Sequence, residues 1–460
     1  MTDRPAATDR PTMTDEAARA EAANFRRSFL IQLVVAGLAT TAMHATRPTM
    51  TYRALALGAS PLEIGLIQSA FSILPALTAV AIGRYIDRVG ESRYLMLSLL
   101  TLALGSLFAT VAGGLLPLAL AQVALGFGQI IYLVSSQSLI ANHGPRAGRE
   151  GRYGHYSTVN SLGQLAGPAI AAAIVGSALA TIALATSGQI ASADPAPLAA
   201  VAAPLAAGGG FLEDNPEGRV FLLAGILALV ACGLASRIPG YPRRPVDPAA
   251  TAAEPGLLRL AGQVLRRQGM ISAMSVSITV ISAVDVLIAY LPAYGEEAGL
   301  SVALVGILLS VRAGSSLVSR LFMTQLITLL GRSRLLALSM VMAGGGIAVM
   351  PFVSEAAVLV AIMVVVGLGL GLGQPMTIAW VANRSPRRER ATALGVRLTG
   401  NRVALLVVPT LMGAIAGTAG ITAIFIVVAV SLGAGAVIAI ATEFDGPAEP
   451  LAPATVDPET

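Results

Sequence analysis

Residues 141–149 read ANHGPRAGR, and residues 382–390 read ANRSPRRER, at an offset of 241 along the chain. Both stretches open with Ala-Asn, carry a proline at the fifth place and close on arginine. The same register extends from Gly65 with Gly306 to Pro168 with Pro409. It also pairs Gly90 with Gly331, Arg93 with Arg334, Gly105 with Gly346, Gly126 with Gly367, Gly128 with Gly369 and Asn160 with Asn401. Since these residue types seldom coincide by chance, the chain contains an internal repeat, which determines its architecture.

The composition is that of a membrane protein. Hydrophobic residues make up 55% of the chain and charged residues 12%, and the mean hydropathy is +0.75. These values are too apolar for a soluble protein. Apolar runs long enough to span a bilayer, about 20 residues each, are expected near 29–50, 61–83, 94–114, 116–142, 154–180, 219–237, 270–292, 302–330, 335–352, 356–382, 391–417 and 421–441. Each repeat therefore holds six of the twelve expected spans.

An even number of spans in each repeat predicts two parallel halves, related by an axis along the membrane normal. All 30 basic residues are arginine, and they gather in every second loop. By the positive-inside rule these loops face the cytoplasm, so both termini are expected there. The predicted fold is an all-α integral membrane protein with twelve transmembrane helices. The net charge of +5 reflects this topology, and no nucleic-acid partner is expected.

The domain boundaries follow from the repeat. We expect a disordered cytoplasmic tail at 1–25, an N-terminal six-helix half at 26–237 with an external insertion at about 182–218, a cytoplasmic linker at 238–269, a C-terminal half at 270–441 and a tail at 442–460. Leucines and arginines alternate late in the linker. This pattern is typical of an amphipathic helix on the inner membrane surface, but the favoured interpretation is a plain connection between the halves.

Few residues could hold a metal or a cofactor. Cys232 is the only cysteine, and the three histidines, at 44, 143 and 155, are scattered. The sequence shows no nucleotide-binding loop and no nucleophile with a positioned base. We therefore expect no cofactor, no metal site and no enzymatic activity.

The loop at 83–93 reads GRYIDRVGESR. Its informative residues are Gly83, Asp87, Arg88, Gly90 and Arg93. This pattern resembles the cytoplasmic signature of the major facilitator superfamily, although Glu91 and Ser92 stand where that family usually carries basic residues. The resemblance covers about 29–441 and implies a transporter that works by alternating access. It also implies that the loop gates the cytoplasmic side, with Asp87 at the positive N-terminal end of the helix that begins near Ala391.

The expected span at 154–180 carries small residues at helical spacing. Gly154, Gly163 and Gly167-Pro168 resemble the antiporter motif of exporters in the family, although two alanines replace its closing glycines. Such spacing favours export, but it also arises from ordinary helix packing. In proton-linked drug exporters of the family, an arginine stands at the position of Gln122. This chain lacks that arginine, so the arginine does not couple its transport to an energy source.

Ionisable groups inside a membrane cost about 2.5 to 3.5 kcal/mol each on insertion scales, so each needs a partner or a purpose. Asp285 lies in the outer half of its span, its repeat mate is His44, and Arg312 lies at a similar depth. We expect these three residues to couple solute to protons, with an ion pair between Asp285 and Arg312. Alternatively, Asp285 forms only a structural ion pair, and His44 bonds a nearby hydroxyl such as that of Thr41.

Other polar residues in the spans are candidates for lining a central cavity. They are Arg402, Asn401, Asn160, Gln122 and Arg47. The repeat places Asn160 and Asn401 at equivalent depths, where they either bridge helices or face the cavity. Arg397 lies nearer the cytoplasmic end, and its side chain is expected to extend to the membrane interface.

These patterns predict a monomeric, multi-pass protein of the bacterial cytoplasmic membrane. Its partners are a small organic solute, protons and the lipid bilayer. Proton-coupled export is the favoured function, and proton-coupled uptake of an organic acid or a sugar-like solute is the alternative. Deep arginines outnumber deep acids, which favours a substrate with a carboxylate or another anionic group. A receptor or regulator built on a transporter fold is the alternative from another class.

Overall fold

The computed structural model describes residues 15–78, 82, 86, 90–142, 149–187, 215–238, 262–384 and 390–442. Within these ranges, side chains are not described for 15–23, 141, 142, 149–151, 177–187, 382 and 390–392. The described part is helical and has no strand. It contains twelve helices long and apolar enough to cross a membrane, as the hydropathy pattern predicts.

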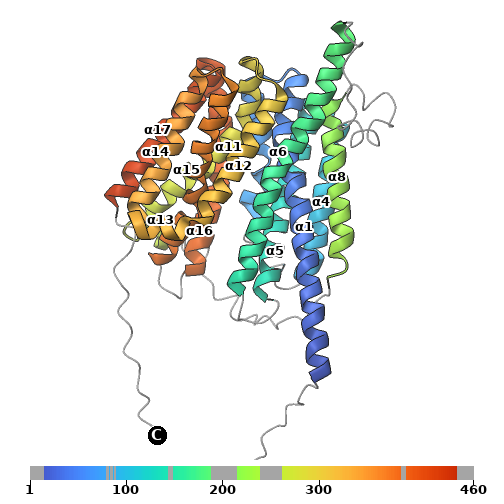
Figure 1. Ribbon diagram of the computed structural model, residues 1–460, viewed down its shortest axis with the longest axis vertical. Coiled ribbons are helices and arrows are strands. Elements are labelled where there is room, and N and C mark those ends of the chain that lie inside the picture. Colours follow the sequence, from blue (N-terminus) through green and yellow to red (C-terminus); the bar gives the residue numbers. More distant parts are fainter. Residues whose placement is uncertain are drawn as a thin grey trace, which may run out of the picture.

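The helices form two bundles that stand side by side (Figure 1). The N half consists of α1 (Asp15–Ala56), α2 (Pro61–Ala70), α4 (Glu91–Thr110), α5 (Leu115–Asn142), α6 (Arg149–Ser187) and α8 (Pro216–Ala235). The C half consists of α11 (Met270–Glu297), α12 (Val302–Leu321), α13 (Met323–Leu330), α14 (Arg332–Val349), the short turn η1 (Met350–Phe352), α15 (Ala356–Asn383), α16 (Arg390–Ala419) and α17 (Ile421–Ala441).

The repeat extends to the conformation of the turns. Gly58 and Gly299, a pair at the offset of 241, have φ of 78° and 70°. Gly90 and Gly331, a second such pair, have φ of 106° and 76°. Only glycine adopts these angles without strain. We call the two ends of the bundle the Gly58 end and the Gly90 end, after the turns that lie there.

Serines at equivalent positions begin the helices that follow the first pair of turns. The hydroxyl of Ser60 caps α2 in a capping box with Glu63, and the hydroxyl of Ser301 accepts a hydrogen bond of 3.2 Å from the backbone of Leu304 in α12. Such caps satisfy amide groups that have no partner within the helix. Local sequence signals therefore set the start of the same helix in both halves.

Several predicted boundaries are wrong. Helix α1 begins at Asp15, so the segment 15–25 is helical, in keeping with its many alanines, which are strong helix formers. The expected external insertion is shorter than predicted, because α6 continues to Ser187 and α8 begins at Pro216. Residues 1–14, 188–214 of the insertion, 239–261 of the linker and 443–460 lie outside the described residues.

Two predicted spans are interrupted. The span expected at 302–330 divides at Phe322 into α12 and α13. The span expected at 61–83 breaks at Phe71, where α2 ends, and the helix resumes at 73–78. Pro75 explains the second break, because it lacks the amide that would bond the Phe71 carbonyl four residues earlier.

Two helix pairs and one central contact join the halves. Helix α2 packs on α16, helix α6 packs on α12, and α1 runs beside α11. We call the first two contacts the α2–α16 seam and the α6–α12 seam. The helices α4, α8, α14 and α17 pack mainly within their own halves, at the outside of the molecule.

Each seam holds a glycine against the backbone of the opposite half. A Cβ atom on Gly65 would lie 2.5 Å from the carbonyl oxygen of Pro409, and one on Gly306 would lie 2.9 Å from that of Pro168. A Cβ on Gly306 would also collide with the methyl group of Ala172. Gly65 pairs with Gly306 in the repeat, and Pro168 pairs with Pro409, so both seams use equivalent residues. Close packing explains why these residues recur.

Candidate functional site

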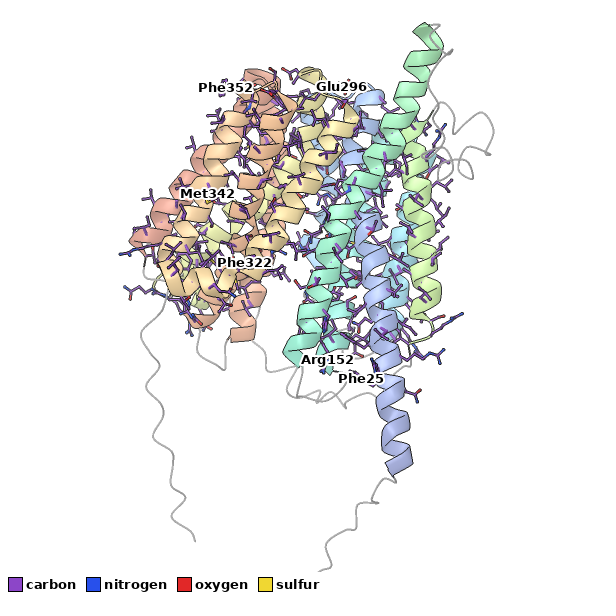
Figure 2. All side chains as sticks on the ribbon, viewed as in Figure 1. Phe25, Arg152, Glu296, Phe322, Met342 and Phe352 are labelled. Carbon is purple, nitrogen blue, oxygen red and sulfur yellow. The ribbon has the colours of Figure 1, made fainter. Side chains whose placement is uncertain are left out.

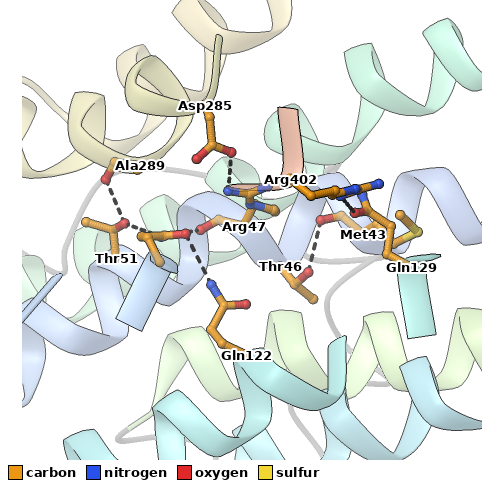
Figure 3. Close-up of polar contacts among 10 residues, drawn as sticks. Met43, Thr46, Arg47, Thr51, Gln122, Gln129, Asp285, Ala289 and Arg402 are labelled. Carbon is orange, nitrogen blue, oxygen red and sulfur yellow. Dashed lines mark hydrogen bonds and ion pairs between the residues drawn. The ribbon is translucent and has the colours of Figure 1, made fainter. Parts of the chain in front are cut away.

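A buried ion pair joins the halves where α1 passes α11 (Figure 3). The guanidinium of Arg47 on α1 donates to Oδ1 of Asp285 on α11. Their side chains are only 12% and 6% exposed. Arg47 also lies over the ring of Phe71, with its Cζ atom 4.5 Å from the ring centroid. The second carboxylate oxygen of Asp285 is buried and has no hydrogen-bond partner among the described residues.

Side-chain amides from the N half support Arg47 (Figure 3). Gln68 on α2 donates to the hydroxyl of Thr51 at 3.0 Å and to the carbonyl of Arg47 at 3.4 Å. It accepts a bond of 3.1 Å from Gln122 on α5. Thr51 donates across the halves to the carbonyl of Ala289 on α11 at 2.8 Å. Gln122, predicted to face a cavity, therefore belongs to a bonded network behind the ion pair.

Arg402 on α16 is a second buried guanidinium beside the ion pair. It is 7% exposed, and it reaches across the halves to donate to Gln129 of α5 at a long 3.3 Å. No described carboxylate lies within ion-pair distance of it. The positive charge of Arg47 repels the Arg402 guanidinium, and the negative charge of Asp285 attracts it. We call Arg47, Asp285 and Arg402 the charge cluster.

The predicted ion pair between Asp285 and Arg312 is wrong. Asp285 pairs with Arg47, which comes from the helix that runs directly beside α11. Arg312 is buried on α12, and its Nε atom has no hydrogen-bond partner in the described part of the chain. Equal depth in the membrane does not fix the rotation of a helix about its axis, and rotation decides which side chains meet.

The partner of His44 is a backbone carbonyl. Its Nδ1 atom lies 2.9 Å from the oxygen of Thr40, one turn earlier on α1. The sequence suggested the hydroxyl of Thr41 as an alternative partner, but His44 bonds the carbonyl of Thr40 instead. The charges of Arg47 and Arg312 both act on the imidazole. Its role in coupling stays a prediction.

The two equivalent asparagines each bond a neighbouring helix of their own half. Asn160 on α6 accepts from the hydroxyl of Thr40 on α1 at 2.5 Å. Asn401 on α16 accepts from the hydroxyl of Ser277 on α11 at 3.1 Å. Of the two alternatives left by the sequence, helix bridging is the arrangement found.

The small residues of α6 serve two contacts. Cβ atoms on Gly163 and Gly167 would each lie 2.8 Å from atoms of α1, and Pro168 lies in the α6–α12 seam. A Cβ on Gly154 would meet nothing within 4 Å. Gly163 and Gly167 therefore let α6 approach α1 closely, which is the packing role expected of small residues, while the Pro168 carbonyl meets Gly306 of α12.

The expectation that Arg397 extends to the membrane interface is wrong. Its side chain is 6% exposed and donates to Gln374 at 2.7 Å and to Thr377 at 3.0 Å, both on α15. These two acceptors draw the guanidinium into the C half, because a buried charge needs hydrogen bonds.

The loop of the cytoplasmic signature is described only in part. Gly83, Asp87 and Arg88 lie outside the described residues, so the expected contact between Asp87 and the start of α16 stays a prediction. Gly90 makes the sharp turn before α4, and Arg93 is exposed. The gating role of this loop stays a prediction.

Sequence reasoning missed two residues of the site, Gln68 and Gln129. Their repeat mates are Leu309 and Leu370. An amide in one half opposite a leucine in the other is a signal that the repeat comparison could have used. No cluster of three possible metal ligands occurs in the described residues.

Comparison with known proteins identifies the architecture. The family model of the Major Facilitator Superfamily matches residues 32–325 and 283–458. The putative multidrug resistance protein MdtD of Salmonella typhimurium (strain LT2) is 28% identical over 138 residues, which are 30% of this chain and 29% of that protein. The match thus spans less than a third of either protein.

Solved structures share the fold at low sequence identity. A bacterial homologue of the human lysosomal transporter Spinster, in an inward-facing and unoccupied conformation, superposes with a TM-score of 0.67 at 16% identity, over 91% of this chain and 96% of that one. A POT family transporter in complex with 5-aminolevulinic acid gives 0.67 at 13% identity, over 90% and 96%.

Proposed function

Since this chain belongs to the major facilitator superfamily, we propose that it exports a small organic solute across the bacterial cytoplasmic membrane in exchange for protons. The observation that carries the proposal is the buried pair of Arg47 and Asp285, because it joins one helix of each half. A proton on Asp285 would neutralise the carboxylate and remove the attraction. Protonation of Asp285 would thereby weaken the contact between the halves.

The free-energy change from losing this ion pair is large enough to drive a conformational change. Removing one partner of a buried ion pair costs about 3 to 5 kcal/mol. Moving a two-state equilibrium from 1:99 to 99:1 takes about 5.5 kcal/mol. Protonation of one carboxylate thus supplies most of the free energy needed to convert one conformation into the other.

The contacts between the halves support a conformation that is closed at the Gly58 end. Hydrogen bonds between described residues of the two halves come from Arg47, Thr51, Ser69 and Arg402. Arg47 and Thr51 lie toward the Gly58 end of α1, Ser69 lies in the last turn of α2, and Arg402 lies near the middle of α16. Because the positive-inside rule puts the Gly90 end in the cytoplasm, this conformation corresponds to an inward-facing state.

The direction of transport rests on two further observations. The small residues of α6 pack it closely on α1 and on α12, as the resemblance to the exporter motif implies. The relative in Salmonella typhimurium is described as a putative multidrug resistance protein. Both favour export.

The excess of arginine favours a second function, proton-coupled uptake of an organic acid. The charge cluster holds two arginines and one carboxylate, and Arg312 adds another buried positive charge. Protonation of Asp285 would release Arg47 and so strengthen the binding of an anion. Proton and anion would then cross together, whereas an exchanger requires them to compete. The two functions predict opposite effects of acid on solute binding.

The test measures flux in membrane vesicles with an imposed pH gradient. Ethidium serves as a cationic probe and para-aminohippurate as an anionic probe. An exporter driven by exchange accumulates its probe in everted vesicles with an acidic lumen. An uptake system accumulates its probe in right-side-out vesicles in an acidic medium.

The Asp285→Asn variant should lose the response to the pH gradient but retain exchange of labelled for unlabelled probe. Glu297→Gln is the matched control, because Glu297 lies on the same helix but is exposed. Normal proton-driven flux in Asp285→Asn would refute the coupling role. Absence of flux for both probes under every gradient, together with binding of a protein partner, would support a receptor instead.

A further inference from the structure

A groove of about 430 Å³ lies between α1 and α8 toward the Gly90 end. Its lining consists of Arg26, Arg27, Leu30, Ile31, Val34 and Leu234. It is far from the charge cluster along α1, and transport as proposed above makes no use of it. The combination of two arginines with apolar walls gives the groove a chemistry of its own.

The lining residues of α1 lie on one face of the helix, because positions 27, 30, 31 and 34 follow helical spacing. Leu30 is 54% exposed and Val34 52% exposed, although both lie within a membrane span. Their exposed surface therefore faces the hydrocarbon of the bilayer. Figure 2 shows this part of α1 at the lower edge of the bundle, with Phe25 marking its level.

The arginines lie where the span leaves the hydrocarbon. The apolar run of α1 begins at Phe29, two residues after Arg27, and both Arg26 and Arg27 are exposed. Charged groups at this depth meet lipid headgroups, while the leucines one turn further meet acyl chains. The walls of the groove are apolar, and the two exposed arginines lie at its end nearest the headgroups.

We infer that this groove binds an anionic phospholipid, whose phosphate lies on Arg26 and Arg27 and whose acyl chain lies along Leu30, Val34 and Leu234. Guanidinium groups match the geometry of phosphate oxygens and form charge-assisted hydrogen bonds with them. A volume of about 430 Å³ is in the usual range of small-molecule sites. A water-soluble phosphate would leave the apolar walls uncovered, so the lipid is the occupant that satisfies both parts of the groove.

The charge predicts selectivity for anionic over zwitterionic lipid. An arginine near an anionic membrane surface contributes about 1 kcal/mol, and about 1.4 kcal/mol is a factor of ten in affinity. Loss of one arginine should weaken binding about fivefold, and loss of both should weaken it about thirtyfold.

Native mass spectrometry of the full chain tests this inference. Phosphatidylglycerol and phosphatidylcholine with the same acyl chains are titrated against the purified protein. The wild type should retain phosphatidylglycerol preferentially, and the double variant Arg26→Gln/Arg27→Gln should lose the preference. The control is Arg332→Gln/Arg334→Gln, a second pair of exposed arginines at the Gly90 end but on α14.

Two further measurements separate the lipid site from simpler explanations. Val34→Trp, which fills the groove, should reduce phosphatidylglycerol binding while the melting temperature stays that of a folded protein. Glycerol 3-phosphate should not replace the lipid. Equal retention of both lipids, an equal loss in the control pair, or full competition by glycerol 3-phosphate would each overturn the inference.

Discussion

The substitution Gly306→Ala should open the Gly58 end of the molecule. In the observed conformation the added methyl group would meet the Pro168 carbonyl oxygen at 2.9 Å and would collide with Ala172. Both neighbours belong to the backbone or to the first side-chain atom of α6, so neither can rotate away. Relief requires α6 and α12 to separate.

The magnitude follows from the cost of overpacking. Extra methyl groups in a well-packed contact cost about 1 to 3 kcal/mol. The penalty applies only to the conformation in which the seam is closed. It should therefore raise the ratio of open to closed molecules about 5- to 150-fold.

Cysteine accessibility measures this ratio. The single native cysteine, Cys232, is first replaced by alanine, and Ser69→Cys is introduced as the reporter. Ser69 is 5% exposed, and its hydroxyl lies 2.8 Å from that of Thr410 across the α2–α16 seam. The rate of labelling by a membrane-impermeant maleimide applied at the Gly58 side should rise with Gly306→Ala in proportion to the open fraction.

Gly154→Ala is the matched control, because a Cβ there meets no atom within 4 Å. It should stabilise α6 slightly, since alanine is the better helix former, and leave the labelling rate unchanged. The reasoning would be wrong if Gly306→Ala did not change the rate, or if Gly154→Ala raised it equally. Melting temperatures show whether both variants are folded.

Three other predictions concern single side chains. Arg397→Gln should lower the melting temperature, because it removes two buried hydrogen bonds. Arg402→Gln should raise the melting temperature of the solute-free protein, because it removes a buried charge without an acidic partner. The opposite order of the two melting temperatures would contradict this account. Tyr290→Phe should cost about 1 kcal/mol of unfolding free energy, measured by chemical denaturation, since its hydroxyl donates to the Pro409 carbonyl at 2.6 Å; no loss would mean that water replaces the bond. Transport by Asp285→Asn should be independent of the imposed pH gradient, as probe flux will show, and a retained dependence would place the coupling group elsewhere.

The sequence predicts the fold well because its signals are local or periodic. The number of spans comes from hydropathy, and the turn at Gly90 comes from the glycines of the loop at 83–93. The boundaries that failed depend on context. The break at Phe71 is an exception, because it follows from Pro75, whose effect on a helix can be predicted from the sequence.

The candidate site is less predictable, for a physical reason. Counting residues gives the depth of a side chain, since a helix rises about 1.5 Å per residue. It does not give the direction in which the side chain points once helices from two halves are packed together. The sequence predicts a similar depth for Asp285 and Arg312, but the side chain that Asp285 contacts is that of Arg47 on α1.

The two seams have the symmetry of a homodimer interface. Gly65 of the N half contacts Pro409 of the C half, while Gly306 of the C half contacts Pro168 of the N half. This reciprocal pattern, in which residue i meets j and j meets i, defines an isologous contact. Each half therefore carries both sides of its own interface, and the chain has the form of a two-fold dimer whose subunits have been fused. The charge cluster at its centre is where that two-fold relation is broken, because Arg47 and Asp285 have no counterparts of their own kind in the opposite half.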